Sequence, residues 1–206
     1  MAPDASAAQR AYEEIKKEIL DGALPVQGRL DVEALARTLG LSSMPVRQAL
    51  SLLTWERLVR PGRHSAYEVA LWSELDLAQL YEWRGALLSL ALPSAASGPE
   101  LKRIVRTQPY AEAVQAVMGL IEAGANLELR RAATNADERL LAARKVEAEV
   151  LGDVQGEFEA LVMALADRSR RASTLQRAYV RRRINAAPAL RQRVVLKALP
   201  SNGGPR

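Results

Sequence analysis

Three short segments near the start of the chain repeat apolar residues at the spacing of an amphipathic helix, with turn or cap residues between them. The first ends at Asp21-Gly22 and the second at Gly40. The third follows Ser42-Ser43, either of which can cap a helix, and Pro45 is tolerated in its first turn. The apolar positions are Tyr12, Ile15 and Ile19, then Val32, Leu35, Ala36 and Leu39, then Val46, Leu50 and Leu53. This pattern predicts three short helices that must share one core.

The apolar period changes after the third segment. Leu58-Val59-Arg60 and Ala66-Tyr67-Glu68-Val69 are typical of short strands, and they flank the turn-forming segment Pro61-Gly62-Arg63-His64-Ser65. Three short helices followed by a small hairpin predict a winged helix-turn-helix domain over residues 8–71.

From residue 72 onward the pattern is helical throughout. Ser73 begins the first of these helices, with Asp76 in the capping-box position. Further helices are expected over 100–107, 110–123, 127–150, 157–171, 175–185 and 189–199. We therefore predict a mainly α protein, in which the winged domain is followed by an all-helical bundle over residues 72–200 and a disordered tail over 201–206.

The composition excludes several classes of function. The absence of cysteine excludes disulfide frameworks, thiolate metal sites and a cysteine nucleophile. The chain has a single histidine, His64, so a metal site built from several histidines is excluded. His64 lies beside no obvious nucleophile in the sequence, so we do not expect an enzyme. Apolar runs are too short to span a bilayer, and no signal peptide is evident, so we expect a cytoplasmic protein without a membrane partner.

Charge is distributed unevenly along the chain. Residues 73–167 carry nine Lys and Arg against fifteen Asp and Glu, whereas residues 168–206 carry eleven Lys and Arg and no acid. The basic segment either contacts phosphates or an anionic effector, or packs against the acidic helices and neutralises them. We favour the second interpretation.

The third predicted helix has an exposed polar face opposite its apolar stripe. The residues of that face are Met44, Arg47, Gln48 and Ser51. An arginine can donate two hydrogen bonds to guanine, a glutamine suits adenine, and a methionine side chain can lie against a thymine methyl group in the major groove. A solvated helix face is the alternative interpretation, but the order of helices and basic hairpin favours DNA reading.

Two neighbouring segments complete the candidate interface. Ser42 and Ser43, at the start of the reading helix, suit contacts to phosphate oxygens. Arg63 and His64, at the tip of the predicted hairpin, suit an adjacent minor groove.

Residues 39–50, Leu-Gly-Leu-Ser-Ser-Met-Pro-Val-Arg-Gln-Ala-Leu, followed by Leu53, Glu56, Leu58 and Val59, closely resemble the GntR family of bacterial repressors. Ile19-Leu20-Asp21-Gly22 and Gly28-Arg29-Leu30 fit the same pattern. The resemblance covers roughly residues 8–70 and implies a homodimer that binds a palindromic double-stranded operator. Many members carry Arg where this chain has Ser43, and the wing glycine is replaced near Ser65 and Ala66, which implies either an altered operator preference or a weaker affinity.

The segment that follows resembles a second, C-terminal type within that family. Residues 76–84, Asp-Leu-Ala-Gln-Leu-Tyr-Glu-Trp-Arg, look like the first helix of the FCD type, the FadR-like branch. In that type the bundle dimerises the protein and binds small carboxylates, which implies Arg84 and Asp137 as effector-site residues. An arginine fork matches a carboxylate. The alternative is that Arg84 pairs with an acidic helix of the bundle.

The same resemblance bears on cofactors. FCD domains commonly hold a divalent metal through one Asp and three His. Asp137 remains here, but Leu141 stands at the next ligand position, and Gln192 or a neighbour stands at a later one. A lone carboxylate does not hold a transition metal, so we expect neither metal nor cofactor.

Two functional hypotheses follow. In the first, the protein is a homodimeric transcriptional repressor whose operator binding responds to a small carboxylate. In the second, it binds DNA or acts as a protein adaptor without any effector, because its ligand domain is degenerate.

Overall fold

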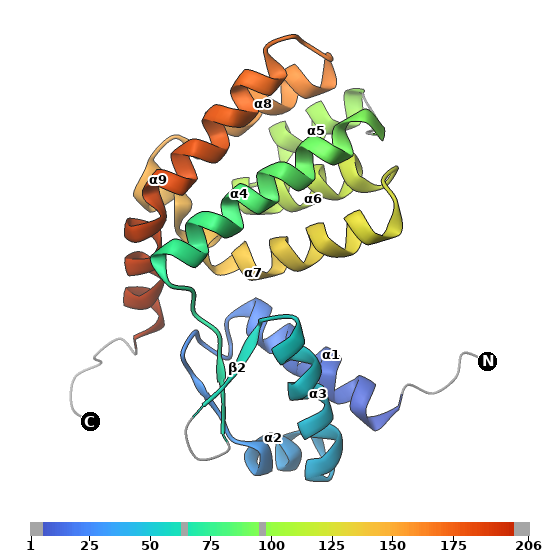
Figure 1. Cartoon of the computed structure of the whole chain (residues 1–206), viewed down its shortest axis with the longest axis vertical. Helices are drawn as coiled ribbons and strands as arrows, with labels where there is room; N and C mark the ends of the chain where they lie inside the picture. Colours follow the sequence, from blue (N-terminus) through green and yellow to red (C-terminus); the bar gives the residue numbers. More distant parts are fainter. Residues whose placement is uncertain (1–5, 63–65, 95–97, 200–206) are drawn as a thin grey trace. The chain divides into compact units, whose positions relative to one another are not determined.

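The computed structural model describes residues 6–62, 66–94 and 98–199. The chain divides into two compact units, the first extending to Leu71 and the second spanning Trp72–Lys197. Each unit is described by itself below (Figure 1).

The first unit contains three helices, α1 (Ala7–Asp21), α2 (Val32–Leu39) and α3 (Ser43–Trp55). Asp31 caps α2 by accepting a hydrogen bond from Ala34 N at 2.8 Å. Gly40 ends α2 with a φ of 64°, a left-handed conformation that glycine adopts without steric cost. Helix α2 therefore ends at Gly40, the glycine at which the sequence predicts its end.

A three-stranded antiparallel sheet completes this unit. Its strands are β1 (Arg29–Leu30), β2 (Val59–Pro61) and β3 (Tyr67–Val69), in the order β1-β3-β2. The predicted hairpin is β2–β3. Strand β1 was not predicted, because a two-residue strand is too short to show an alternating pattern; it forms by pairing with the middle strand, β3.

The helices and the sheet of this unit enclose one apolar core. Val46, Ala49, Leu50 and Leu53 on α3 are 0% exposed and pack with residues of α1, α2 and the strands. Burying this side of α3 leaves its opposite side in solvent.

The second unit is built from helices alone within its described residues. They are α4 (Glu74–Ala91), a short 3₁₀ turn (Leu92–Ser94), α5 (Pro99–Thr107), α6 (Tyr110–Glu122), α7 (Leu127–Leu151), α8 (Val154–Ala166) and α9 (Ala172–Ala198). The predicted capping box at α4 is present: Ser73 Oγ accepts from Asp76 N, and Asp76 Oδ2 accepts from Ser73 N. The mainly α fold class is confirmed.

Two helix predictions in this unit were wrong. Separate helices were predicted on either side of Pro188, but α9 runs continuously through this residue. A proline removes one backbone donor, yet buried Ala187, Leu190 and Val194 anchor the helix around that point. The helix expected over 157–171 is α8, which starts earlier and ends at Ala166; Arg168 then turns the chain with a φ of 50°.

Buried aromatic and aliphatic residues from several helices form the core of the second unit. Phe158 on α8 is 0% exposed, and its ring meets that of Tyr110 edge-on at 5.8 Å between centroids. None of the described helices combines the length and apolar character that a membrane crossing requires.

Candidate functional site

The exposed side of α3 carries the four residues proposed to read DNA. Met44 is 65% exposed, and Arg47, Gln48 and Ser51 are also exposed. The structure thus places them together on one helical ridge, with no apolar packing to hold them. A ridge of this size fits the major groove of B-form DNA.

The N-terminus of α3 is a second part of the candidate interface. Ser42 occupies the N-cap position, but its side chain makes no capping hydrogen bond. Ser42 is exposed and Ser43 is half-buried. The first amides of a helix point along its axis at the positive end of its dipole, so this end of α3 suits a phosphate oxygen.

Arg47 has one weak partner. Its Nη2 atom lies 3.9 Å from Glu33 Oε1 on α2, and the two side chains are 48% and 61% exposed. An exposed ion pair at this distance contributes little stability. The guanidinium can therefore leave Glu33 at small cost.

Two residues that were not among the predicted site residues extend the exposed face of α3. Leu52 is 49% exposed and Trp55 is 85% exposed on α3. Trp55 lies seven residues after Gln48, so it occupies the same side of the helix. The sequence pattern could have shown that Leu52 and Trp55 are exposed, because neither residue belongs to the apolar stripe of α3.

A polar cluster fixes the C-terminal end of α3 against α1. Tyr12 Oη donates to Glu56 Oε1 at 2.6 Å, and Lys16 Nζ donates to Glu56 Oε2 at 3.0 Å. Partial burial and the Glu56 carboxylate raise the pKa of Tyr12, which keeps this phenol protonated as a donor. The C-terminal end of α3 is thus held by a charge-assisted contact.

The hairpin is held by a salt bridge across its two strands. Arg60 donates to Glu68 Oε2 from Nη2 at 2.8 Å and from Nε at 3.2 Å. Gly62 N donates to Ala66 O at 2.8 Å, which closes the hairpin. Arg63 and His64, proposed for the minor groove, lie outside the described residues.

The second unit holds the two residues proposed for an effector site, and it brings them together. Arg84 on α4 donates to Asp137 on α7 from Nε at 2.6 Å and from Nη2 at 3.0 Å. The same Nη2 lies 2.5 Å from Glu122 Oε1 on α6. Arg144 also donates to Asp137, at 2.6 Å. The interpretation that Arg84 pairs with acids of the bundle thus describes this structure.

The two carboxyls around Arg84 have opposite pKa shifts. Burial by itself raises the pKa of Asp137, but the charges of Arg144 and Arg84 outweigh it and hold that pKa below its ordinary value. Burial raises the pKa of Glu122, and Arg84 only partly offsets it. Glu122 Oε1 accepts no directed hydrogen bond, and Arg84 Nη1 is buried without an acceptor among the described residues.

A small cavity lies beside these groups. Its volume is about 20 Å³, and it is lined by Tyr81, Arg84, Gly85, Leu88, Met118, Arg144, Tyr179, Val180 and Arg183. A space of this size holds about one water molecule.

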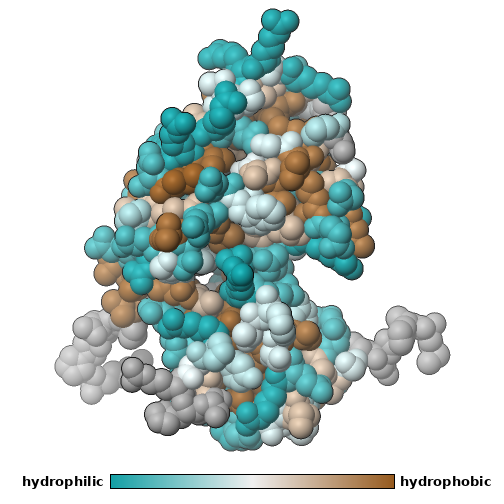
Figure 2. Space-filling view, viewed as in Figure 1, coloured by the Kyte–Doolittle hydropathy of each residue, from teal (hydrophilic) through white to brown (hydrophobic). Residues whose placement is uncertain are grey.

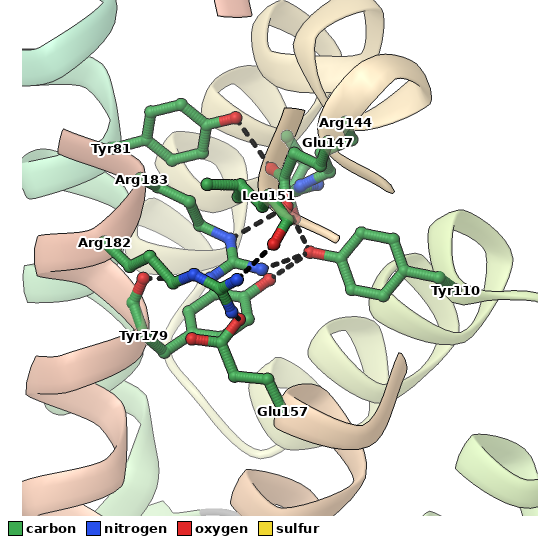
Figure 3. A network of polar contacts seen from close by, with 10 residues as sticks. Tyr81, Tyr110, Arg144, Glu147, Leu151, Glu157, Tyr179, Arg182 and Arg183 are labelled. Atoms are coloured by element: carbon green, nitrogen blue, oxygen red, sulfur yellow. Dashed lines mark hydrogen bonds and ion pairs between the residues drawn. The ribbon is translucent and has the colours of Figure 1, made fainter. Parts of the chain in front are cut away.

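A largely buried ionic network (Figure 3) also borders this cavity, whose lining includes Tyr81, Tyr179 and Arg183. Glu147 on α7 accepts hydrogen bonds from Tyr81, from Tyr110 and from Arg183 Nε. Arg183 also donates to Glu157 at 2.9 Å, and its guanidinium carbon lies 3.3 Å from the centroid of the Tyr179 ring. Burial and the Glu147 charge raise the pKa of Tyr179 to about 12. Every polar end of this network meets a partner of suitable chemistry.

The basic C-terminal segment is partly neutralised by acidic helices, as the favoured interpretation expected. Arg182 and Arg183 pair with Glu157 on α8, and Arg193 and Lys197 pair with Glu149 on α7. Among the described residues, no group of three or more His, Cys, Asp or Glu side chains is arranged to hold a metal ion.

Comparison with known proteins bears on the class to which the first unit belongs. Residues 7–69 match the family described as bacterial regulatory proteins, gntR family, and so form a GntR-family domain. An uncharacterised HTH-type transcriptional regulator, YdhC of Bacillus subtilis, is 27% identical over 81 residues, which are 39% of this chain. The match spans only 36% of the length of YdhC.

Solved structures resemble the chain over most of its length. A GntR transcriptional regulator from Rhodococcus sp. RHA1, itself described as putative, has a TM-score of 0.70 at 18% identity, covering 90% of this chain and 98% of that one. E. coli McbR/YncC has a TM-score of 0.66 at 18% identity, covering 92% and 99%. At this identity the likeness concerns the fold: a GntR helix-turn-helix domain followed by a helical domain.

Proposed function

We propose that this protein is a sequence-specific DNA-binding transcriptional regulator, a repressor that binds a palindromic operator as a homodimer. The single observation that carries the proposal is the exposed side of α3, where Met44, Arg47, Gln48 and Ser51 form one polar ridge in solvent. The GntR-family match over the same unit supports it.

In this proposal each part of the first unit contacts a different part of the DNA. Arg47 donates to a guanine edge and Gln48 contacts an adenine. Ser42, Ser43 and the open amides at the start of α3 bind phosphates and set the depth of the helix in the groove. Arg63 and His64 enter the neighbouring minor groove.

The experiment that tests this proposal is selection of binding sites from random duplex DNA by the full chain, at two salt concentrations. An enriched palindrome supports a dimeric, sequence-reading protein, because a two-fold protein reads two equivalent half-sites. Binding that is salt-sensitive but enriches no sequence contradicts base reading by α3, since phosphate contacts alone give that result.

We propose further that a small carboxylate modulates the regulator through Arg84. Arg84 Nη1 is buried beside the cavity and lacks an acceptor among the described residues, so one donor is available to a ligand. Asp137 orients the guanidinium by accepting from its other two nitrogens. The ligand would act by binding one conformation of the bundle more tightly than another.

The effector-independent alternative is favoured by a different observation. The cavity has room for about one water molecule, and Arg84 is already held by two carboxylates. A carboxylate ligand would have to displace Glu122 or Asp137. On this alternative the bundle is a fixed scaffold for a constitutive DNA binder.

Thermal unfolding in the presence of a panel of small carboxylic acids separates the two versions. An effector at 100 times its dissociation constant stabilises the fold by about 2.7 kcal/mol, and the gain should vanish in Arg84→Lys. No stabilisation by any acid, with operator binding intact, contradicts the effector-modulated version.

A further inference from the structure

The cavity beside Arg84 contains a buried donor without an acceptor. Arg84 is 4% exposed, and its Nε and Nη2 atoms are engaged by Asp137 and Glu122. Its third nitrogen, Nη1, is buried and has no hydrogen-bond partner among the described residues. Because proteins rarely leave a buried donor unsatisfied, such a group typically marks the place of a bound water or ion.

The walls of this cavity carry positive charge. Arg84, Arg144 and Arg183 line it from α4, α7 and α9. Each of these arginines pairs with a carboxylate, but no Asp or Glu is among the residues that line the cavity. Figure 3 draws Arg144 and Arg183 with Tyr81 and Tyr179, whose phenols also line it.

A lining of this kind favours an anion over a water molecule. A buried water that accepts from Arg84 must also donate its own hydrogens, whereas an anion only accepts. The three guanidiniums offer no acceptor, since a guanidinium only donates. Leu88, Met118 and Val180 complete the walls. Their apolar side chains lower the local dielectric constant and so strengthen the attraction between an anion and the guanidiniums.

The size of the cavity limits which anion fits. Its volume of about 20 Å³ holds one sphere of about the size of a water molecule. A chloride ion is only slightly larger than water and needs no particular orientation. Carboxylate, phosphate and sulfate groups are larger, so they would have to displace part of the wall.

We propose that this cavity binds a chloride ion, which accepts from Nη1 of Arg84 and is attracted by the charges of Arg144 and Arg183. The proposal rests on the effector site at Arg84 in the proposed function, and it names the ligand that this site accepts without rearrangement. A carboxylate effector needs the same donor, so it must displace the chloride ion in addition to Glu122 or Asp137. Chloride thereby opposes the binding of the effector.

The first test is thermal unfolding of the full chain while sodium chloride replaces sodium methanesulfonate at constant ionic strength. The screening of surface charges then stays unchanged. Methanesulfonate has the charge of chloride but is too large for the cavity. The unfolding midpoint should rise with chloride and level off. We expect a rise of about 3–6 °C once chloride reaches ten times its dissociation constant.

Matched variants separate the buried site from anion binding at the surface. Figure 2 shows hydrophilic side chains over much of the visible face of the helical unit, and exposed cations attract anions as well. Arg84→Lys removes the guanidinium but keeps a positive charge, and should abolish the chloride-dependent rise. Arg131→Lys makes the same change at an α7 residue whose side chain is 67% exposed, and should preserve the rise.

A cavity-filling variant keeps the test decisive if Arg84→Lys folds poorly. Val180→Ile adds one methyl group to a wall of the cavity and leaves every charged residue in place. This variant should retain the helical circular dichroism of the wild type and lose the chloride-dependent rise.

Bromide identifies the bound species and locates it. Bromide has the charge of chloride and a similar size, and it scatters X-rays anomalously near its absorption edge. A crystal of the full chain grown in sodium bromide should show an anomalous peak beside Nη1 of Arg84.

Two results would overturn the proposal: an equal response of the wild type and the folded Arg84→Lys or Val180→Ile variant to chloride, or a cavity that holds water and shows no anomalous peak. Neither experiment contains DNA or a carboxylic acid, so either result leaves DNA reading by α3 and the carboxylate effector to their own tests. Conversely, a panel of acids without effect leaves the measured chloride response unchanged, so the proposals fail separately.

Discussion

Arg183 Nε lies 2.8 Å from Glu147 Oε2, and both side chains are 0% exposed. The pair joins α9 to α7, and Tyr81 on α4 and Tyr110 on α6 donate to the same carboxylate. One buried carboxylate thereby connects four helices of the bundle. Its removal would leave the buried guanidinium with fewer acceptors, and would take from Tyr81 and Tyr110 the carboxylate to which both donate.

Glu147→Ala is therefore expected to lower the free energy of unfolding by about 3–5 kcal/mol, the typical cost of breaking a buried ion pair. Urea unfolding followed by circular dichroism measures it. Glu149→Ala on the same helix is the matched control, because the ion pairs of Glu149 within the described residues are with the exposed cations Arg193 and Lys197. A loss in the control as large as that in Glu147→Ala would contradict the special role of the buried network.

Arg47→Ala should abolish sequence preference while leaving weak, salt-sensitive DNA binding. One arginine that donates twice to a guanine is worth about 1–3 kcal/mol of base discrimination. Binding to a selected site and to a scrambled duplex, each at two salt concentrations, measures this. Arg131→Ala on α7 removes the same charge outside the first unit and should preserve specificity. If Arg47→Ala kept full specificity, α3 would not be the reading helix.

Arg57→Gly is expected to stabilise the first unit. Arg57 has a φ of 59°, a left-handed conformation that costs a side-chain-bearing residue roughly 1 kcal/mol, and it is exposed. Glycine adopts this conformation freely, although its greater flexibility in the unfolded chain offsets part of the gain. Arg57→Ala keeps the strained left-handed conformation and should not raise stability. The difference between the two variants in thermal unfolding therefore measures the contribution of the backbone conformation at this position. Equal stability of the two would refute it.

Gly85→Ala should destabilise the bundle by about 1–3 kcal/mol, the usual cost of overpacking. A Cβ atom at Gly85 would lie 2.7 Å from Cγ2 of Val180, a β-branched side chain with little rotamer freedom. Val180→Ala in the same chain removes the obstructing methyl groups. The double variant should therefore lose less stability than the sum of the two single variants in urea unfolding; strict additivity would exclude the clash.

Asp137→Asn and Glu122→Gln should change the pH dependence of stability in opposite directions. A carboxyl whose pKa is lowered on folding, such as Asp137, contributes stability above its unfolded pKa and loses it as the pH falls through the folded value. A carboxyl whose pKa is raised, such as Glu122, contributes stability below its unfolded pKa and loses it as the pH rises.

Urea unfolding between about pH 3 and pH 7 brackets the ordinary carboxyl pKa values and measures both effects. The cost of Asp137→Asn relative to wild type should shrink as the pH falls. Glu122→Gln should become more favourable relative to wild type as the pH rises. Parallel pH profiles for the two variants would contradict the opposite shifts.

Structural features that depend on residues close together in the chain, such as the buried side of a helix or a helix cap, were predictable from the sequence. The stripe of Val46, Leu50 and Leu53 placed the core side of α3, and its complement gave the exposed face. Ser73 and Asp76 marked the start of α4 because the two partners of a capping box lie three residues apart. The two-residue strand β1 has no such local pattern, since it exists through pairing with β3.

The contacts of the charged residues in the helical unit could not be predicted from the sequence. The sequence placed Arg84 on a helix but left open whether it meets a ligand or an acid; the fold brings Asp137, 53 positions away, to 2.6 Å from its Nε. Glu147 and Arg183 carried no signal, because a charged residue on a helix is normally solvated. Periodicity therefore determines which side of each helix is buried, whereas only tertiary packing determines which buried charges meet, because that depends on how distant helices align.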